Sequence, residues 1–146
     1  PVPLSLKNIG TYHSLVRDAS GNYTAMYEPA PWYVFWRDTS TTYKTSSQQD
    51  EVICFSSVFA PTNLTTPIFH TWEKYDEQAG RWVEILRASF PIRGGREGGY
   101  RGYTSAVAEE GRWRCNVETK SGALIGRISF TVIGTQTTPG LSTKTL

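Results

Sequence analysis

Apolar and polar side chains alternate through Arg112–Val132, and this two-residue period constrains the fold more than any other feature of the chain. In the first half, Trp113, Cys115 and Val117 fall on one face and polar residues on the other. After the turn formers Lys120-Ser121-Gly122, the apolar face resumes with Leu124, Ile128, Phe130 and Val132. A period of two places alternate side chains on opposite faces of a strand. The segment therefore predicts two half-buried antiparallel strands joined by a short turn.

The same period recurs elsewhere, whereas the helical period of 3.6 residues is almost absent. Turn formers between alternating segments predict two more hairpins, Ile68–Tyr75 with Arg81–Phe90 and His13–Arg17 with Tyr23–Tyr27. Trp32–Arg37 and Val52–Phe59 are apolar on both faces, which is typical of central strands.

About eight short strands with regularly spaced turns predict an all-β protein built as an antiparallel β-sandwich. The topology is expected to be immunoglobulin-like or jelly-roll, with a closed barrel as the alternative. Residues 1–133 are predicted to form one domain, because a chain of 146 residues suits a single core. Thr39–Asp50 is expected to be a loop, and the small polar residues 134–146 a flexible C-terminal tail.

Charge and cysteine content limit the classes of function. A net charge of +2 is too small to indicate a nucleic-acid partner, and no apolar run reaches the length of a transmembrane helix. Cys54 and Cys115 are compatible with a disulfide or with free buried thiols. With only His13 and His70 beside them, the spacing predicts no metal site, and no cofactor is expected.

No catalytic residues are predicted. The chain has no GxSxG motif, and His70 shares a strand face with Trp72, as a packed histidine would. The acidic pairs Asp76-Glu77 and Glu109-Glu110 lie in turns, where carboxylates are solvated. The domain is therefore expected not to be an enzyme, with a hydrolase-like enzyme as the least favoured alternative.

The aromatic run PWYVFW at Pro31–Trp36 offers a second alternative. Alternating large apolar residues are what a sandwich interior requires. If Trp32, Tyr33 and Trp36 were exposed instead, they could stack on sugar rings, as in a carbohydrate-binding module.

The segment PIRGGREGGYRGY at Pro91–Tyr103 combines five glycines with three arginines. It lacks the repeats of an RNA-binding segment and the motif of a phosphate-binding loop, so we expect an ordered, glycine-cornered connection between strands. The predicted ligand-binding residues are Arg93, Arg96, Tyr100, Arg101 and Tyr103. The expected ligand is anionic, an anionic lipid headgroup or a polysaccharide, while pairing of the arginines with Glu97 would make the loop architectural.

Four short motifs occur in order along Ile68–Ile133: His70-Thr71-Trp72, Arg101-Gly102-Tyr103-Thr104, Gly111-Arg112-Trp113-Arg114 and, after Gly122, Phe130-Thr131-Val132. In this order and spacing the segment resembles the bacterial domain of unknown function 2914 family. Two positions depart from the pattern, since Cys115 stands where valine is more usual and Thr104 where serine is.

The resemblance implies the soluble domain of a bacterial membrane protein, with hydrophobic helices preceding a junction at Pro1–Lys7. It implies a periplasmic location in the cell envelope, and it brings no known activity. The expected function is that of a non-enzymatic binding domain for an anionic envelope ligand or a protein partner.

Overall fold

The computed structural model describes residues 4–30, 41–45, 50–60, 67–90, 93–94, 99–135 and 139–146, and for residues 93–94 only the backbone. The described part of the chain contains strands and no helix. The strands are β1 Ser5–Tyr12, β2 Ser14–Arg17, β3 Tyr23–Tyr27, β4 Thr42–Thr45, β5 Glu51–Phe59, β6 Ile68–Asp76, β7 Arg81–Phe90, β8 Arg93–Gly94, β9 Tyr100–Val107, β10 Gly111–Glu118, β11 Leu124–Gly134 and β12 Ser142–Thr145.

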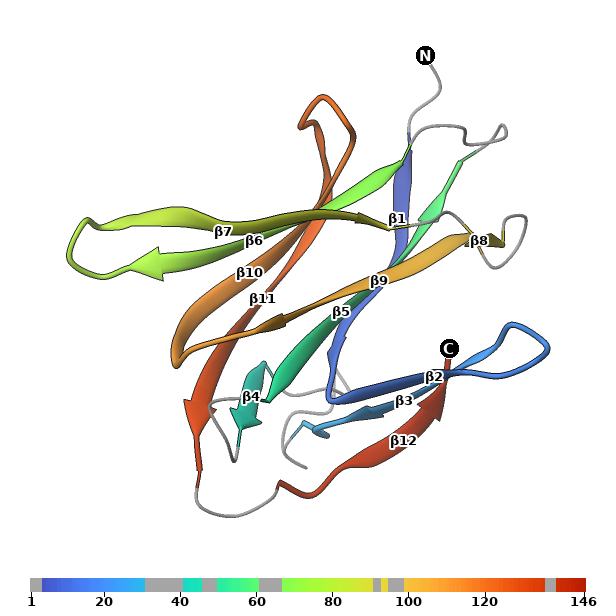
Figure 1. Cartoon of the computed structure of the whole chain (residues 1–146), viewed down its shortest axis with the longest axis horizontal. Coiled ribbons are helices and arrows are strands. Elements are labelled where there is room, and N and C mark those ends of the chain that lie inside the picture. The colour runs from blue at the N-terminus through green and yellow to red at the C-terminus, as the bar shows by residue number, and fades with distance from the viewer. Residues whose placement is uncertain are drawn as a thin grey trace.

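The strands form three open sheets (Figure 1). We call them the five-stranded sheet, in the order β4-β11-β10-β6-β7, the central sheet, β1-β5-β9-β8, and the small sheet, β12-β3-β2. Every pairing is antiparallel except that of β4 with β11. The prediction of an all-β antiparallel sandwich is confirmed, and the sheets do not close into a barrel.

Strand β5 lies in the middle of the molecule and faces two cores. Val52 and Cys54 point to the cluster shared with the five-stranded sheet, where Trp72, Trp113 and Phe130 pack. Phe55, on the opposite face, packs against Tyr12, Tyr23 and Ala25 beneath the small sheet. This double burial explains why the strand is apolar on both faces, and it confirms the prediction for Val52–Phe59.

The three predicted hairpins are present as β2–β3, β6–β7 and β10–β11. Trp113, Cys115, Val117, Phe130 and Val132 are buried, and Ile128 is partly buried, as the alternation predicts. Leu124 is the exception, with 51% of its surface exposed. It pairs with Glu118 beyond a register shift at Val117/Glu118, and this shift takes it away from the core face.

Two segments expected to be irregular contain strands. Strand β4 lies inside the predicted loop because Tyr43 is buried there and its hydroxyl donates to the carbonyl of Glu51 at 2.9 Å. Strand β12 lies inside the predicted flexible tail, paired with β3 and followed by Leu146, which packs against the core under the small sheet. Neither segment has an apolar period, because each strand is only four residues long and mostly polar in sequence. Trp32–Arg37 lies outside the described residues.

Candidate functional site

The arginine-rich connection is seen only in part. Arg93 and Gly94 form β8 and pair with Arg101 and Tyr100 of β9, while Arg96 lies outside the described residues. Gly99 takes φ +71°, the conformation for which glycine is suited. Gly102 packs against Phe90 so closely that a Cβ would overlap the ring. These two glycines agree with the predicted glycine-cornered connection.

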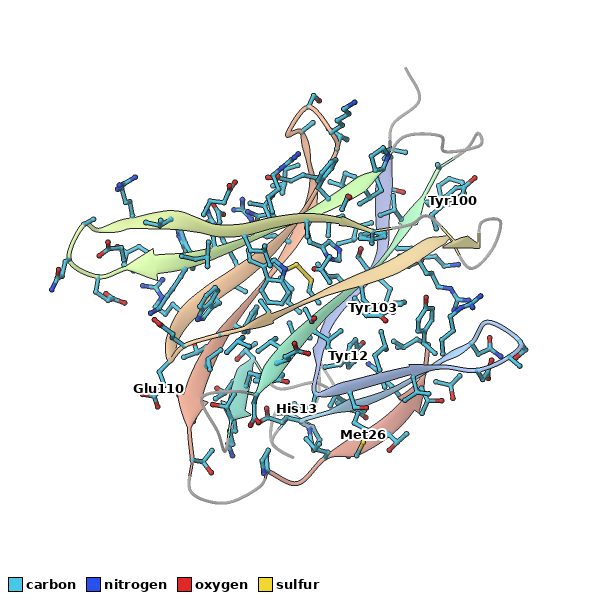
Figure 2. All side chains as sticks on the ribbon, viewed as in Figure 1. Tyr12, His13, Met26, Tyr100, Tyr103 and Glu110 are labelled. Atoms are coloured by element: carbon cyan, nitrogen blue, oxygen red, sulfur yellow. A yellow bond between two sulfur atoms is a disulfide. The ribbon has the colours of Figure 1, made fainter. Side chains whose placement is uncertain are left out.

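Arg101 is the arginine of this segment whose side chain the structure describes, and it is hydrogen-bonded to other parts of the protein. The Arg101 guanidinium donates to the main-chain oxygens of Gly21 at 2.9 Å and Leu146 at 3.1 Å, and it lies 5.3 Å from the centre of the Tyr23 ring. Tyr103 is 46% exposed and its ring meets that of Tyr23 edge-on, while Tyr100 is half-buried. Both tyrosines belong to β9 (Figure 2). Arg101 therefore ties the central sheet to the small sheet.

A second polar cluster lies inside the core, around His70. Its Nε2 lies 2.8 Å from Oγ of Ser56, and its Nδ1 lies 2.8 Å from Oγ1 of Thr104. Oγ1 of Thr104 also accepts a hydrogen bond from Nε1 of Trp72 at 3.0 Å. The three strands β5, β6 and β9 meet here, so no sequence spacing could have indicated the contact.

The Ser56–His70 pair has the composition of a catalytic pair but not its setting. Both side chains have 0% of their surface exposed. Burial lowers the pKa of His70 to about 3, so the ring is neutral at physiological pH and a weak base. The network satisfies buried polar groups that link the two sheets, which is the packed role expected for His70.

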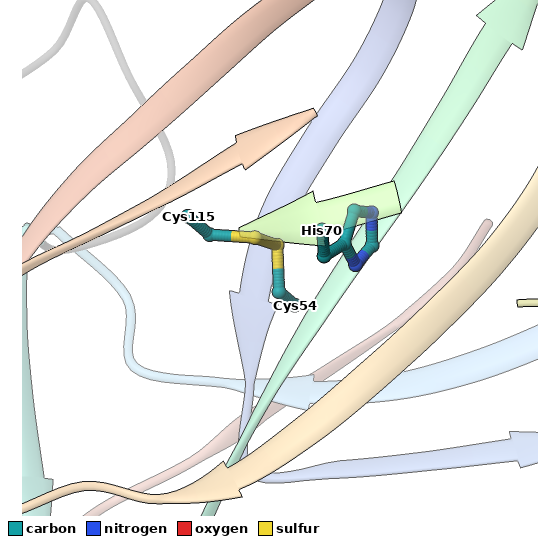
Figure 3. Close-up of side chains that lie close together, drawn as sticks. All are labelled: Cys54, His70 and Cys115. Atoms are coloured by element: carbon teal, nitrogen blue, oxygen red, sulfur yellow. A yellow bond between two sulfur atoms is a disulfide. The ribbon is translucent and has the colours of Figure 1, made fainter. Parts of the chain in front are cut away.

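Next to His70, Cys54 and Cys115 form a disulfide between the central and five-stranded sheets (Figure 3). The disulfide was one of the two alternatives for these cysteines. The two sulfurs and a ring nitrogen of His70 all lie within 4.8 Å of one another. Within the described residues this is the group of potential metal-ligating atoms that lie so close together. In the disulfide the two sulfurs are bonded to each other and are not the thiolates that bind metal ions. Sequence spacing does not show this proximity, because the three side chains come from three strands.

Away from the core, the β6–β7 hairpin projects beyond the sandwich (Figure 1). It forms one wall of a cleft. Oδ1 of Asp76 accepts from the amides of Gln78 and Ala79, both at 3.0 Å, which fixes the hairpin turn. The opposite wall is the β9–β10 turn, whose Glu109 carbonyl accepts from the indole of Trp113 at 2.7 Å. Both walls are therefore held in place without a ligand.

This hairpin cleft has a volume of about 400 Å³. Its lining residues are Lys74, Tyr75, Asp76, Glu77, Val83, Ile85, Glu109, Glu110, Gly111 and Arg112. Ile85 is the extra residue of β7 where its register with β6 shifts, and 54% of its surface is exposed. Lys74 forms an ion pair with Glu109 at 3.2 Å across the cleft.

On the face of the β6–β7–β10 strands opposite Lys74 and Val83, aromatic rings carry two arginines. The Arg112 guanidinium lies 4.5 Å from the centre of the Tyr75 ring and 5.7 Å from that of Trp82, and Arg114 lies 4.3 Å above Trp82. Tyr75 and Trp82 meet edge-on at 5.3 Å. We call these four residues the arginine–aromatic platform.

The two arginines of the platform differ in their partners. Arg114 donates to Oε1 of Glu73 at 2.6 Å. Burial alone would raise the pKa of Glu73, but hydrogen bonds from Arg114 and Asn116 outweigh it and lower that pKa. Arg112 is exposed and forms no ion pair with any acid in the described part of the chain. Its guanidinium therefore has no carboxylate partner among the described residues.

The alternation correctly placed Arg112 and Arg114 on the solvent face. It could not reveal the platform, because that requires β10 to pair with β6, as in the register Trp113–Lys74. The aromatic residues proposed for sugar stacking, Trp32, Tyr33 and Trp36, lie outside the described residues.

Comparison with known proteins identifies part of the chain. Residues 65–132 match the family model described as "Protein of unknown function (DUF2914)". This stretch is similar to that family. It contains β6, β7, β9 and β10, and therefore His70, Thr104 and the whole arginine–aromatic platform. The family resemblance is thereby confirmed over these residues.

Among solved structures, the chain is similar to an immunoglobulin-like protein from Pseudomonas aeruginosa, at 10% identity and a TM-score of 0.48. The similarity covers 90% of this chain and 97% of that protein. No curated protein matches the sequence. In the described part of this chain, there is no helix of the length and hydrophobicity needed to cross a membrane.

Proposed function

We propose that the domain binds a partner protein in the hairpin cleft, with Arg112 holding a carboxylate of the partner. The observation that carries this proposal is the state of Arg112. It is exposed, stacked on Tyr75 and Trp82, and without an acidic partner among the described residues.

Stacking favours binding because it orders the guanidinium in advance. A long side chain loses roughly 0.5–1.5 kcal/mol of rotamer freedom when a ligand immobilises it. Two aromatic faces already confine Arg112, so less of that freedom remains to be lost. The planar fork can then take both oxygens of a carboxylate.

The charges around Arg112 favour a protein segment over a polyanion. The cleft is lined by two cations, Lys74 and Arg112, and four carboxylates, those of Asp76, Glu77, Glu109 and Glu110. These acids lie in one cleft, where charges within about 10 Å act on the same ligand. The four carboxylates would repel a polysaccharide or lipid surface with many negative charges. A protein segment with one carboxylate and flanking basic residues can instead pair its carboxylate with Arg112 and its basic residues with the acids of the cleft.

Apolar residues on the other face of the hairpin supply the remaining contact. Val83 and Ile85 line the cleft, and the exposed Ile85 has apolar surface for a partner to cover. Burying an aliphatic side chain there would contribute roughly 1–2 kcal/mol. The preferred ligand therefore carries an acidic residue for Arg112 and an aliphatic residue near it that reaches the Val83 and Ile85 side of the hairpin.

The wider context of the proposal is that of an envelope protein. We infer from the family resemblance that the domain belongs to a bacterial membrane protein and lies in the periplasm. In that setting the domain would act by binding a protein partner rather than by catalysis.

A displayed library of random peptides tests the proposed function on the whole chain. We expect selected peptides to carry an acidic residue beside an aliphatic one, with lysine or arginine nearby, and to bind less tightly as salt rises. Arg112→Gln should weaken binding at least about tenfold, because it removes a charge-assisted bidentate contact.

Arg81→Gln is the matched control, since Arg81 is an exposed arginine of the same hairpin that does not line the cleft. It should change affinity by less than about twofold. Selection of peptides with no acidic residue, or equal loss in both variants, would contradict the proposal. So would binding to anionic vesicles or glycans that depends on Arg112.

A further inference from the structure

The cluster of Cys54, His70 and Cys115 joins three strands at the centre of the molecule (Figure 3). All three side chains have 0% of their surface exposed. A sulfur from β5, a sulfur from β10 and a nitrogen from β6 converge within 4.8 Å. A single cation placed among them could contact all three donors.

We propose that the reduced form of this protein binds one Zn²⁺ ion through Cys54 Sγ, Cys115 Sγ and a ring nitrogen of His70. Thiolate and imidazole are the donors that Zn²⁺ prefers in proteins. The charge also fits a buried site, since two thiolates and a neutral imidazole balance the ion. A monovalent thiophilic ion such as Cu⁺ would leave a net negative charge in the core, which is costly there.

The distances agree with such a site. Zn–S bonds of about 2.3 Å in tetrahedral geometry place two sulfurs roughly 3.8 Å apart. The Cα atoms of Cys54 and Cys115 are 6.7 Å apart, near the wide end of the range for disulfides. Once the disulfide opens, the sulfurs can separate with little movement of the strands.

The hydroxyls around His70 supply the contacts that a histidine ligand needs. Ser56 Oγ and Thr104 Oγ1 each lie 2.8 Å from one ring nitrogen. One nitrogen can turn to the ion while the other donates its hydrogen to a hydroxyl, which fixes the tautomer.

The conversion balances with a dithiol as reductant. The dithiol gives two electrons and two protons to the disulfide and becomes a disulfide itself, leaving Cys54 and Cys115 as thiols. Zn²⁺ then replaces the two thiol protons, which pass to solvent. Oxidation and metal binding therefore exclude each other at this cluster.

Because the site is fully buried, the ion must enter when the sheets open or while the chain folds. The experiment therefore unfolds the chain in denaturant with a dithiol, then refolds it with equimolar Zn²⁺ or the spectroscopic substitute Co²⁺. We expect one Zn²⁺ retained per chain after gel filtration, and visible absorption from cobalt–thiolate bonds. Zinc should also raise the Tm of the reduced chain and leave that of the oxidised chain unchanged.

Cys115→Val is the main variant, since it keeps an apolar side chain at this position. It should bind Zn²⁺ at least about 100-fold more weakly than the reduced parent chain. Circular dichroism checks that the variant folds, and the effect of zinc on the parent Tm tests the proposal without any variant. Failure of the reduced parent to retain zinc, equal binding by Cys115→Val, or tighter binding of Cu⁺ than of Zn²⁺ would overturn it.

Discussion

Nε1 of Trp72 donates a hydrogen bond to Oγ1 of Thr104 at 3.0 Å, across the interface between the five-stranded and central sheets. The same oxygen lies 2.8 Å from Nδ1 of His70. Among the described residues, no buried side-chain nitrogen or oxygen lacks a partner. A single hydroxyl thus serves two buried ring nitrogens.

Removing this hydroxyl should destabilise the core more than removing the methyl group beside it. Thr104→Val leaves both ring nitrogens without their partner, so we expect a loss of about 2–4 kcal/mol in the free energy of unfolding. Thr104→Ser keeps the hydroxyl and should lose about 1 kcal/mol or less. Urea unfolding of both variants measures the difference, and equal losses would show that the hydroxyl contributes little.

The buried His70 should make the protein sensitive to mild acid. Its folded pKa of about 3 lies below the usual value of 6.5, so the unfolded chain binds the extra proton first. This contribution to stability is complete above pH 6.5 and falls by up to about 1.4 kcal/mol per pH unit below it. Between pH 7 and 5, the free energy of unfolding should therefore depend less on pH for His70→Gln than for the parent. Equal slopes for the two proteins would contradict this.

The disulfide should contribute substantially to stability, because it links positions 61 residues apart. Loop-closure entropy for that separation is worth about 4 kcal/mol. Reduction in the presence of a zinc chelator should lower the free energy of unfolding by roughly that amount, and non-reduced Cys115→Val should show a comparable loss. A change below about 1 kcal/mol would mean that strain in the folded state offsets the entropic gain.

Deleting residues 142–146 should weaken the small sheet. The deletion removes β12, the packing of Leu146 and one acceptor of Arg101. We expect a loss of about 1–3 kcal/mol and faster amide hydrogen exchange in β3, with little change in β10. Unchanged exchange in β3 would show that the tail does not pair there in solution.

Gly102→Ala tests the close packing of the arginine-rich connection. A Cβ at this position would overlap the Phe90 ring, so the substitution should cost about 1–3 kcal/mol. Gly140→Ala is the control, since a Cβ there meets no atom within 4 Å. Thermal unfolding that shifts equally in both variants would argue against the predicted contact.

The sequence alone determined the local structure wherever one face of a strand is buried. The alternation around Trp113 and Phe130 predicted both the hairpin and its buried face, and the doubly apolar pattern of Val52–Phe59 predicted a central strand. It failed at β4 and β12, which are four residues long and mostly polar, so that even the buried positions of β4 include the polar Thr45. Local propensity and periodicity report burial through apolar side chains, and short polar strands have few of them.

Only the tertiary structure decided which functional groups meet. His70 and Thr104 are 34 residues apart in sequence, and Cys54 and Cys115 are 61 apart, yet each pair is in contact. Arg112 reaches Tyr75 and Trp82 because β10 pairs with β6 and β6 with β7. A strand's own sequence specifies which of its faces is buried, but the side chains it meets depend on the order and register of its neighbours, which are set by pairing across the whole chain.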